Sequence, residues 1–188
     1  MKIVFNLLFI LIVVTARAQT SRDSGVSDFF ETYQKRLDSM PGRKFEAFDA
    51  YSTAGIRYTT DSLQGKLTLI NFWFEACTPC VAEVEALNHL YRHFEGTGNF
   101  QFLSFTFDPV PQTKAYIREK RISYPVICLK EEKVRKLNGG FGFPLTAIVD
   151  ATGGIVYFKP GGTTDPQTAG EEFKKEVYPV IEKHLSGK

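Results

Sequence analysis

The sequence predicts an α/β fold in which one mixed β-sheet carries helices on both faces. Two apolar runs, at residues 67–74 and 100–107, have the nearly continuous hydrophobicity of strands that are buried on both faces. A segment with helical spacing of apolar residues, 80–94, separates them, and such alternation is typical of layered α/β domains. The composition agrees, because 188 residues with 43% hydrophobic and 23% charged residues exclude disorder, collagen-like repeats and a multi-pass membrane protein.

The chain begins with the pattern of a secretory signal peptide. Lys2 precedes an apolar stretch over residues 3–14, and Ala16-Arg17-Ala18 supplies the small residues typical of a cleavage site. The stretch is shorter than the roughly 20 residues that a membrane-spanning helix needs. We therefore predict cleavage after Ala18, export to the periplasm without stable membrane insertion, and a compartment in which disulfides persist.

The rest of the chain is predicted to form a helical extension and one domain. Residues 26–40 have apolar side chains at helical spacing, and Pro41-Gly42 ends that helix. The predicted division is a signal peptide at 1–18, an N-terminal helical extension at 19–41 and the α/β domain at 42–188. Strands are predicted in the domain at 45–49, 56–59, 67–74, 100–107, 126–129, 145–149 and 155–158. Helices are predicted at 80–94, 114–120, 131–137 and 167–185, the last kinked or restarted at Pro179, which lacks a backbone donor.

Charge and cysteine content exclude two further classes of protein. The net charge is +2, and removal of Lys2 and Arg17 with the leader leaves 21 basic and 21 acidic residues. We therefore expect no basic surface for nucleic acid. Three cysteines are too few for a small disulfide-stapled domain, so a packed core must hold the fold. Cys128 falls in the strand predicted at 126–129, where we expect a buried free thiol that behaves as a small hydrophobe.

The chemistry is predicted to lie in Cys77-Thr78-Pro79-Cys80, which follows the first buried strand and opens the next helix. A cysteine attacks disulfides as a thiolate, and the unpaired N–H groups at a helix N-terminus stabilise that anion. Pro79 suits the first helical turn, where its missing donor costs nothing. We expect Cys77 to be exposed and to attack, and Cys80, one turn further in, to be shielded and to resolve the mixed disulfide.

Structural, metal-binding and chance roles for the cysteine pair are each disfavoured. A purely structural disulfide would close a very short loop and constrain the unfolded chain little. A zinc site with His89 and His93 fails on distance, because Cys80 and His89 would lie roughly 13 Å apart along a helix. The two histidines alone have the spacing for a shared metal, but a solvated helix face is the favoured interpretation. Chance occurrence of two cysteines is disfavoured in an exported chain with this strand and helix context.

The segment LTLINFWFEACTPCVAEVEAL resembles the active-site strand and helix of the thioredoxin superfamily, in particular its exported TlpA/ResA-type thiol-disulfide oxidoreductases. The likeness extends over about 42–188, and its further landmarks are Asn71-Phe72-Trp73, Glu83, Tyr124-Pro125-Val126 and Phe143-Pro144 with Ile148-Val149-Asp150. The resemblance implies a thioredoxin-like fold and a cis peptide bond between Phe143 and Pro144 opposite the cysteines. It also implies protein disulfide substrates, a membrane thiol electron donor and, as one role of such proteins, cytochrome c maturation.

A proton acceptor for Cys80 has to be sought away from residue 71. Asn71 occupies the position at which thioredoxin keeps a buried carboxylate, and an amide cannot accept and release a proton. The candidates are Glu75, before the motif, and Glu83, one turn beyond Cys80. Either could instead be a solvated charge. We favour Glu75 slightly, because it stands between a buried strand and the motif, where desolvation would raise its pKa.

A surface for the substrate is predicted around the motif. The residues assigned to substrate binding are Trp73, Thr78, Pro79, Phe143 and Pro144, with Phe74 and Phe141 as further parts of an apolar rim. Burial of Trp73 beneath the motif is the competing interpretation. Gly139, Gly140 and Gly142 would make the loop before Pro144 pliable. No cofactor and no metal are expected beyond a redox-active Cys77–Cys80 disulfide.

These patterns lead to one preferred function and several rivals. We predict an exported oxidoreductase that reduces protein disulfides through a CxxC cycle. The alternative is a copper-binding assembly factor, since 102–109 resembles a strand of Sco-type proteins, although those use CxxxC and a later histidine and only His184 follows His93 here. A peroxidase is disfavoured because Thr78 follows Cys77 instead of preceding it in a Thr-x-x-Cys site. A scaffolding module without redox activity is the remaining rival.

Overall fold

The structure is a computed structural model that describes residues 25–187. It contains two compact units, which divide between Met40 and Pro41. The first unit is a helix over residues 25–38, in which the ring of Phe29 lies 5.7 Å from that of Phe30 and 6.4 Å from that of Tyr33. The predicted signal peptide lies outside the described residues. In the part of the chain that is described, no helix is both long and apolar enough to cross a membrane.

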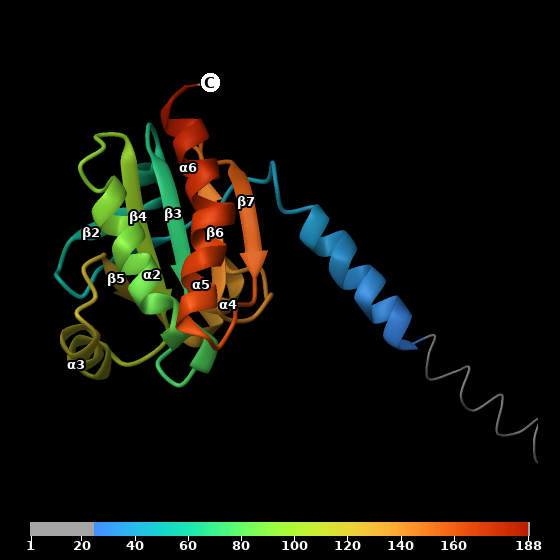
Figure 1. The fold of residues 1–188 in the computed structure, drawn as a ribbon, viewed down its shortest axis with the longest axis horizontal. Helices are drawn as coiled ribbons and strands as arrows, with labels where there is room; N and C mark the ends of the chain where they lie inside the picture. Colours follow the sequence, from blue (N-terminus) through green and yellow to red (C-terminus); the bar gives the residue numbers. More distant parts are fainter. Residues whose placement is uncertain (1–24, 188) are drawn as a thin grey trace, which may run out of the picture. The chain divides into compact units, whose positions relative to one another are not determined.

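A five-stranded mixed sheet organises the second unit (Figure 1). Its strands are β3 (Leu67–Phe72), β4 (Phe100–Thr106), β5 (Val126–Cys128), β6 (Leu145–Val149) and β7 (Ile155–Pro160). The spatial order is β5-β4-β3-β6-β7, in which β3, β4 and β5 run parallel and the last two strands pair antiparallel. The central strands β3, β4 and β6 are buried along their whole length, as their apolar sequences predict.

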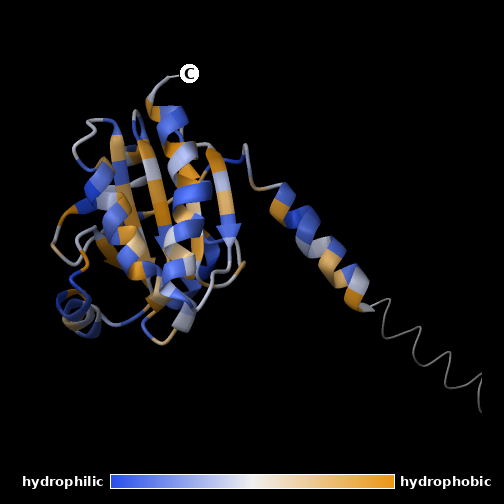
Figure 2. Ribbon diagram, in the orientation of Figure 1, coloured by the Kyte–Doolittle hydropathy of each residue, from blue (hydrophilic) through white to orange (hydrophobic). Residues whose placement is uncertain are grey.

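Helices cover both faces of this sheet, as predicted. They are α2 (Thr78–Phe94), α3 (Val110–Lys120), α4 (Glu131–Leu137), α5 (Pro166–Glu172) and α6 (Tyr178–Leu185), with the π-helical segment η2 (Phe173–Val177) between the last two and a 3-10 turn η1 (Thr60–Leu63) near the start. In Figure 1, α2, α5 and α6 lie in front of the sheet and α4 lies behind it. Figure 2 shows hydrophobic central strands between helices whose outer sides are largely hydrophilic. The core on the α2 face includes Leu69, Leu87, Phe102 and Ile181.

The opposite face of the sheet contains a row of aromatic rings. Phe45, Phe48, Phe105 and Phe72 follow one another with ring centroids 5.3–6.1 Å apart. This packing corrects the strand predicted at 45–49, of which only Asp49 belongs to a strand, β1 (Asp49–Tyr51). Two buried rings three residues apart point into the core together, which the two-residue alternation of a strand does not allow.

The small hairpin of β1 and β2 (Arg57–Thr59) adjoins the β5 edge of the sheet. Ser52 forms a bridge with Ile127, and the Thr53 N–H donates to the Val126 carbonyl at 2.8 Å. Cys128 is the last residue of β5 and is half-buried, not buried as we predict from the sequence. The short strand ends there, so the thiol lies at the rim of the sheet, where burial still raises its pKa.

The C-terminal helix is interrupted where proline predicts a break. It comprises α5 and α6, joined by the π-helical turn of η2 just before Pro179. Proline has no N–H to donate, so the regular bonding pattern cannot continue through it and the helix widens by one residue. Trp73 and Phe74, predicted to end the first buried strand, lie beyond β3 in the loop that leads to the cysteines.

Candidate active site

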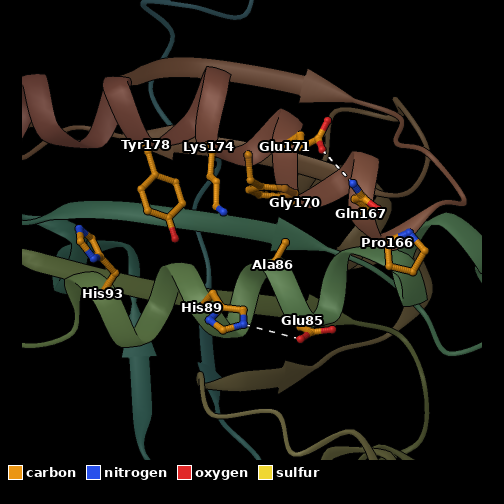
Figure 3. Close-up of a pocket in the computed structure, with 11 residues that line it drawn as sticks. Glu85, Ala86, His89, His93, Pro166, Gln167, Gly170, Glu171, Lys174 and Tyr178 are labelled. Atoms are coloured by element: carbon orange, nitrogen blue, oxygen red, sulfur yellow. Dashed lines mark hydrogen bonds and ion pairs between the residues drawn. The ribbon is translucent and has the colours of Figure 1, made fainter.

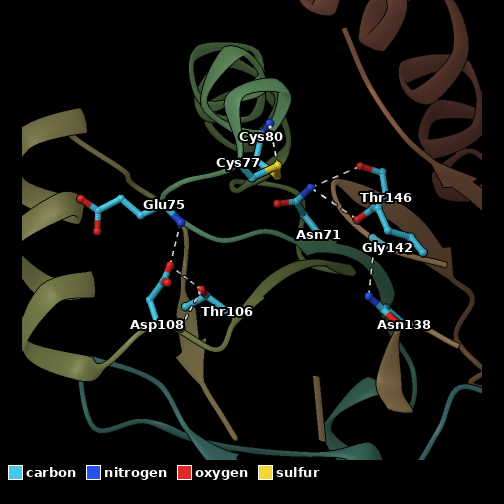
Figure 4. The surroundings of a disulfide bond; sticks show 10 residues. Asn71, Glu75, Cys77, Cys80, Thr106, Asp108, Asn138, Gly142 and Thr146 are labelled. Carbon is cyan, nitrogen blue, oxygen red and sulfur yellow. Dashed lines mark hydrogen bonds between the residues drawn. A yellow bond between two sulfur atoms is a disulfide. The ribbon is translucent and has the colours of Figure 1, made fainter. Parts of the chain in front are cut away.

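The cysteine motif lies where α2 begins. Cys77 is the N-cap residue with an extended backbone, and Pro79 occupies the first turn, so the helix starts at Thr78, not at Cys80 as predicted. The backbone N–H of Cys80 donates to Sγ of Cys77 at 3.3 Å. Cys77 and Cys80 form a disulfide (Figure 4). A thiolate at Cys77 in the reduced protein would therefore keep a helix N–H and the positive end of the helix dipole as partners.

Both cysteines are buried in this disulfide state. Cys77 is 6% exposed and Cys80 is 3% exposed, so Cys77 is not the exposed side chain that we predict from the sequence. The reason is the bond itself, which turns Cys77 toward Cys80 and into the core cluster on the α2 face. The difference in exposure keeps the predicted order, with Cys80 further in.

The loop before β6 brings Pro144 to the cysteines. Leu145 pairs with Phe72 at the end of β3, which places the residue before it beside the loop that carries the motif. The Phe143–Pro144 peptide bond is cis, as the family resemblance implies, and Pro144 is buried. Asn138 holds the approach to this loop by donating from Nδ2 to the Gly142 carbonyl at 3.0 Å. Gly142 has a φ of +87°, which glycine adopts without strain.

Asn71 lies in the sheet behind the disulfide and is buried. Its Nδ2 donates weakly to the Leu145 carbonyl at 3.5 Å and to Oγ1 of Thr146 at 3.4 Å, so the amide links β3 to β6 (Figure 4). This placement leaves a neutral group where a carboxylate would otherwise lie. The charge near the cysteines must therefore come from another element.

Glu83 supplies that carboxyl group from α2. It is 5% exposed, and its Oε2 has no hydrogen-bond partner among the described residues. Residues three apart on a helix are neighbours, so this side chain lies one turn beyond Cys80 on the same side of α2. Burial raises the pKa of Glu83 from 4.5 to about 8; the Lys159 ammonium opposes this shift and the Glu172 carboxylate adds to it. A group with this pKa can accept and return a proton near neutral pH.

Glu75 is directed away from the disulfide (Figure 4). It is half-buried; its Oε2 accepts from Nε2 of Gln112 on α3 at 2.5 Å, and its backbone N–H donates to Oδ2 of Asp108 at 2.7 Å. The geometry thus favours Glu83 as proton acceptor and reverses our preference for Glu75. Asp108 is a site residue that our sequence reasoning missed, although Asp-Pro after a buried strand is a recognisable turn signal.

Trp73 corrects the predicted substrate-binding set. Its side chain is 4% exposed, its indole N–H donates to Oγ of Ser104 at 2.6 Å, and its ring stacks on Tyr116 at 5.3 Å. A substrate at the surface cannot contact this ring. Trp73 therefore supports the motif from below, the competing interpretation of the sequence.

The other predicted contact residues lie nearer the surface. Thr78 is exposed, while Pro79 and Phe143 are half-buried. The Phe143 ring lies 5.4 Å from that of Phe74 and 5.5 Å from that of Phe107, which joins three loops beside the motif into one apolar cluster. Phe141 does not join it, because its buried ring packs on Phe158 at 5.1 Å.

A separate groove runs between α2 and α5 (Figure 3). It is lined by both histidines of α2: His89 lies 3.6 Å from a carboxylate oxygen of Glu85, and His93 packs against Tyr178. None of the predicted site residues lines it. Within residues 25–187, no group of three or more His, Cys, Asp or Glu side chains is placed to hold a metal ion.

Comparison with known proteins agrees with this geometry. The AhpC/TSA family matches residues 41–158. The thiol-disulfide oxidoreductase ResA of Bacillus thuringiensis subsp. konkukian is 22% identical over 180 residues, covering 95% of this chain and 98% of the relative. The thiol:disulfide interchange protein DsbE of Allochromatium vinosum is 28% identical over 132 residues, covering 69% and 68%. A crystal structure of a thioredoxin-family thiol:disulfide interchange protein from Chlorobium tepidum TLS matches with a TM-score of 0.62 and 22% identity, over 77% of this chain and 97% of that one, and shows that the fold is thioredoxin-like.

Proposed function

Because this chain belongs to the AhpC/TSA family, we propose that it acts as a thiol-disulfide oxidoreductase and reduces disulfides in protein substrates. The observation that carries the proposal is the position of Cys77, which caps α2, receives the Cys80 N–H and is bonded to Cys80. An attacking sulfur, a resolving sulfur and a buried carboxyl on the next turn are the groups that the reaction needs.

The reaction proceeds by two exchanges. The Cys77 thiolate attacks one sulfur of the substrate disulfide; that bond breaks, a bond between Cys77 and the substrate forms, and the released thiolate takes up a proton. Cys80 then gives its proton to Glu83 and attacks Sγ of Cys77, which releases the second substrate thiolate. The substrate has gained two electrons and two protons, and Cys77 and Cys80 have become a disulfide. A dithiol protein must return the two electrons.

The setting of this reaction is also part of the proposal. The leader pattern at residues 1–18 supports export to the periplasm, and a membrane thiol protein would then serve as electron donor. Substrates with paired cysteines, including those of cytochrome c maturation, would dock on the apolar cluster of Phe74, Phe107 and Phe143. A reductant needs a low potential, so a measured value near that of strong oxidants (about −120 mV) would contradict the direction.

Insulin reduction tests the proposed activity. With dithiothreitol as electron donor, catalytic amounts of the protein should accelerate the appearance of insulin-chain turbidity well above the rate with dithiothreitol alone. The same preparation, reduced and titrated with Cu(I), addresses the Sco-type alternative. Tight stoichiometric copper binding that Cys77→Ser abolishes, together with no acceleration of insulin reduction, would overturn the proposal.

Gly162 offers a test of how closely the site is packed. A Cβ at this position would lie 2.5 Å from Oε1 of Glu83 and 2.9 Å from Cγ of Pro144. We expect Gly162→Ala to displace one of them, to lower the free energy of unfolding by about 1–3 kcal/mol and to slow insulin reduction. Gly170→Ala is the matched control, because no described atom outside its own helix backbone lies within 4 Å of its added Cβ. Equal losses in both variants, measured by urea unfolding and turbidity, would refute this account of the packing.

A further inference from the structure

A small polar cavity separates Glu83 from the C-terminal helix. Residues of α2, β6, β7 and the segments from α5 to η2 line it, and they include Glu83, Thr146, Tyr157, Lys159 and Glu172. Glu83 is buried, whereas Lys159 and Glu172 are about one-third exposed. The cavity thus places a buried carboxyl and partly solvated charges on the same walls.

Lys159 is fixed in this cavity by two carboxylates. Its Nζ lies 3.0 Å from Oε2 of Glu172 and 2.8 Å from Oε2 of Glu176. The Tyr157 hydroxyl also donates to Oε2 of Glu176, at 3.3 Å. A lysine side chain has many rotamers, and two carboxylates hold this one in a single position. Its ammonium is therefore a fixed charge that faces the cavity from β7.

The charges around Glu83 have opposing effects. The titratable groups near it are Cys80 on α2, Tyr124 before β5, Tyr157 and Lys159 on β7, Glu172 on α5 and Glu176 on η2. Lys159 favours the ionised carboxylate, and Glu172 disfavours it. Asn71 and Thr146, from β3 and β6, are neutral. Lys159 is therefore the one cation in this group that stabilises a negative charge on Glu83.

We propose that Lys159 is a positioning residue for the thiol chemistry: held by Glu172 and Glu176, it stabilises the ionised Glu83 carboxyl so that Glu83 can take the proton of Cys80. The inference rests on the proposed function, because Glu83 has this task only if Cys80 must lose a proton during resolution. Without Lys159, desolvation and the Glu172 carboxylate would act on Glu83 unopposed. Glu83 would then stay protonated at neutral pH and could not act as a base.

The direct test is a carbon-13 NMR titration of the Glu83 carboxyl in the oxidised protein, assigned by its loss in Glu83→Gln. We expect Lys159→Met to raise the titration midpoint of Glu83 by about one pH unit. Lys159→Arg should keep the wild-type midpoint, and Lys159→Met with Glu172→Gln should move it back toward wild type. Lys174→Met, which removes an exposed charge of η2, should leave it unchanged.

A kinetic readout follows from the same shift. If the midpoint rises by one pH unit, the ionised fraction of Glu83 falls about tenfold below the midpoint, and resolution of a preformed mixed disulfide at pH 7 should slow about tenfold. A Glu83 midpoint in Lys159→Met within 0.2 pH unit of wild type would overturn the inference. That result needs no substrate, so it is distinct from failure of the wild-type protein to reduce insulin, which would overturn the proposed function.

Discussion

Reduced protein carrying Cys80→Ser is expected to become covalently linked to its protein substrates. Cys77 keeps its place at the start of α2 and its attack on a substrate disulfide, but no second thiol is present to release the product. The mixed disulfide should therefore accumulate with insulin in the test tube and with natural substrates in extracts. Non-reducing electrophoresis and mass spectrometry of the adducts would measure it and identify the substrates.

The companion variants decide whether this interpretation is right. Cys77→Ser should form no adduct and should reduce insulin no faster than dithiothreitol alone, because the attacking sulfur is missing. Cys128→Ser should behave as wild type, since Cys128 lies at the end of β5, away from the pair. Adducts that persist in Cys77→Ser, or that require Cys128, would show that the roles of the cysteines are misassigned.

Glu83→Gln is expected to slow resolution of the mixed disulfide by about a hundredfold at pH 8. The pKa of Glu83 is raised to about 8, so its ionised fraction grows as pH rises through that value. The wild-type resolution rate should therefore increase with pH and level off above about 8. A glutamine cannot accept a proton, so this inflection should vanish and the rate should follow only the ionisation of Cys80. Stopped-flow mixing of preformed mixed disulfide across pH would measure both profiles.

Glu75→Gln is the matched control for this experiment. The Glu75 carboxylate is bound by Gln112 on α3 and points away from the disulfide, so its loss should leave the pH profile unchanged. A profile that flattens in Glu75→Gln and persists in Glu83→Gln would restore the assignment favoured by sequence alone.

The sequence was sufficient for the local parts of the site. The motif, the strand before it and the helix after it are contiguous, so periodicity and helix-start chemistry predict how Cys77 and Cys80 lie. The family resemblance added Pro144, which the pairing of β6 with β3 brings to the motif. The thioredoxin-like sheet and its helices were predicted for the same reason, with errors mainly at element ends.

The remaining parts depend on contacts between segments distant in sequence. Lys159 and Gly162 reach Glu83 only because β7 lies beside β6, and no short motif records that approach. The direction of the Glu75 side chain depends on Gln112, and the burial of Trp73 depends on Ser104 and Tyr116. Side-chain direction at a strand end is set by such partners, so sequence patterns could not decide between Glu75 and Glu83.

The acidity of Cys77 is the claim on which the whole mechanism depends. Iodoacetamide alkylation of the reduced protein, followed from pH 4 to pH 10 in Cys80→Ser, measures it directly. We expect the rate to reach its half-maximum at a pH well below the pKa of a free cysteine, about 8.5, because a helix N–H faces the sulfur. A half-maximum at or above that value would contradict the mechanism.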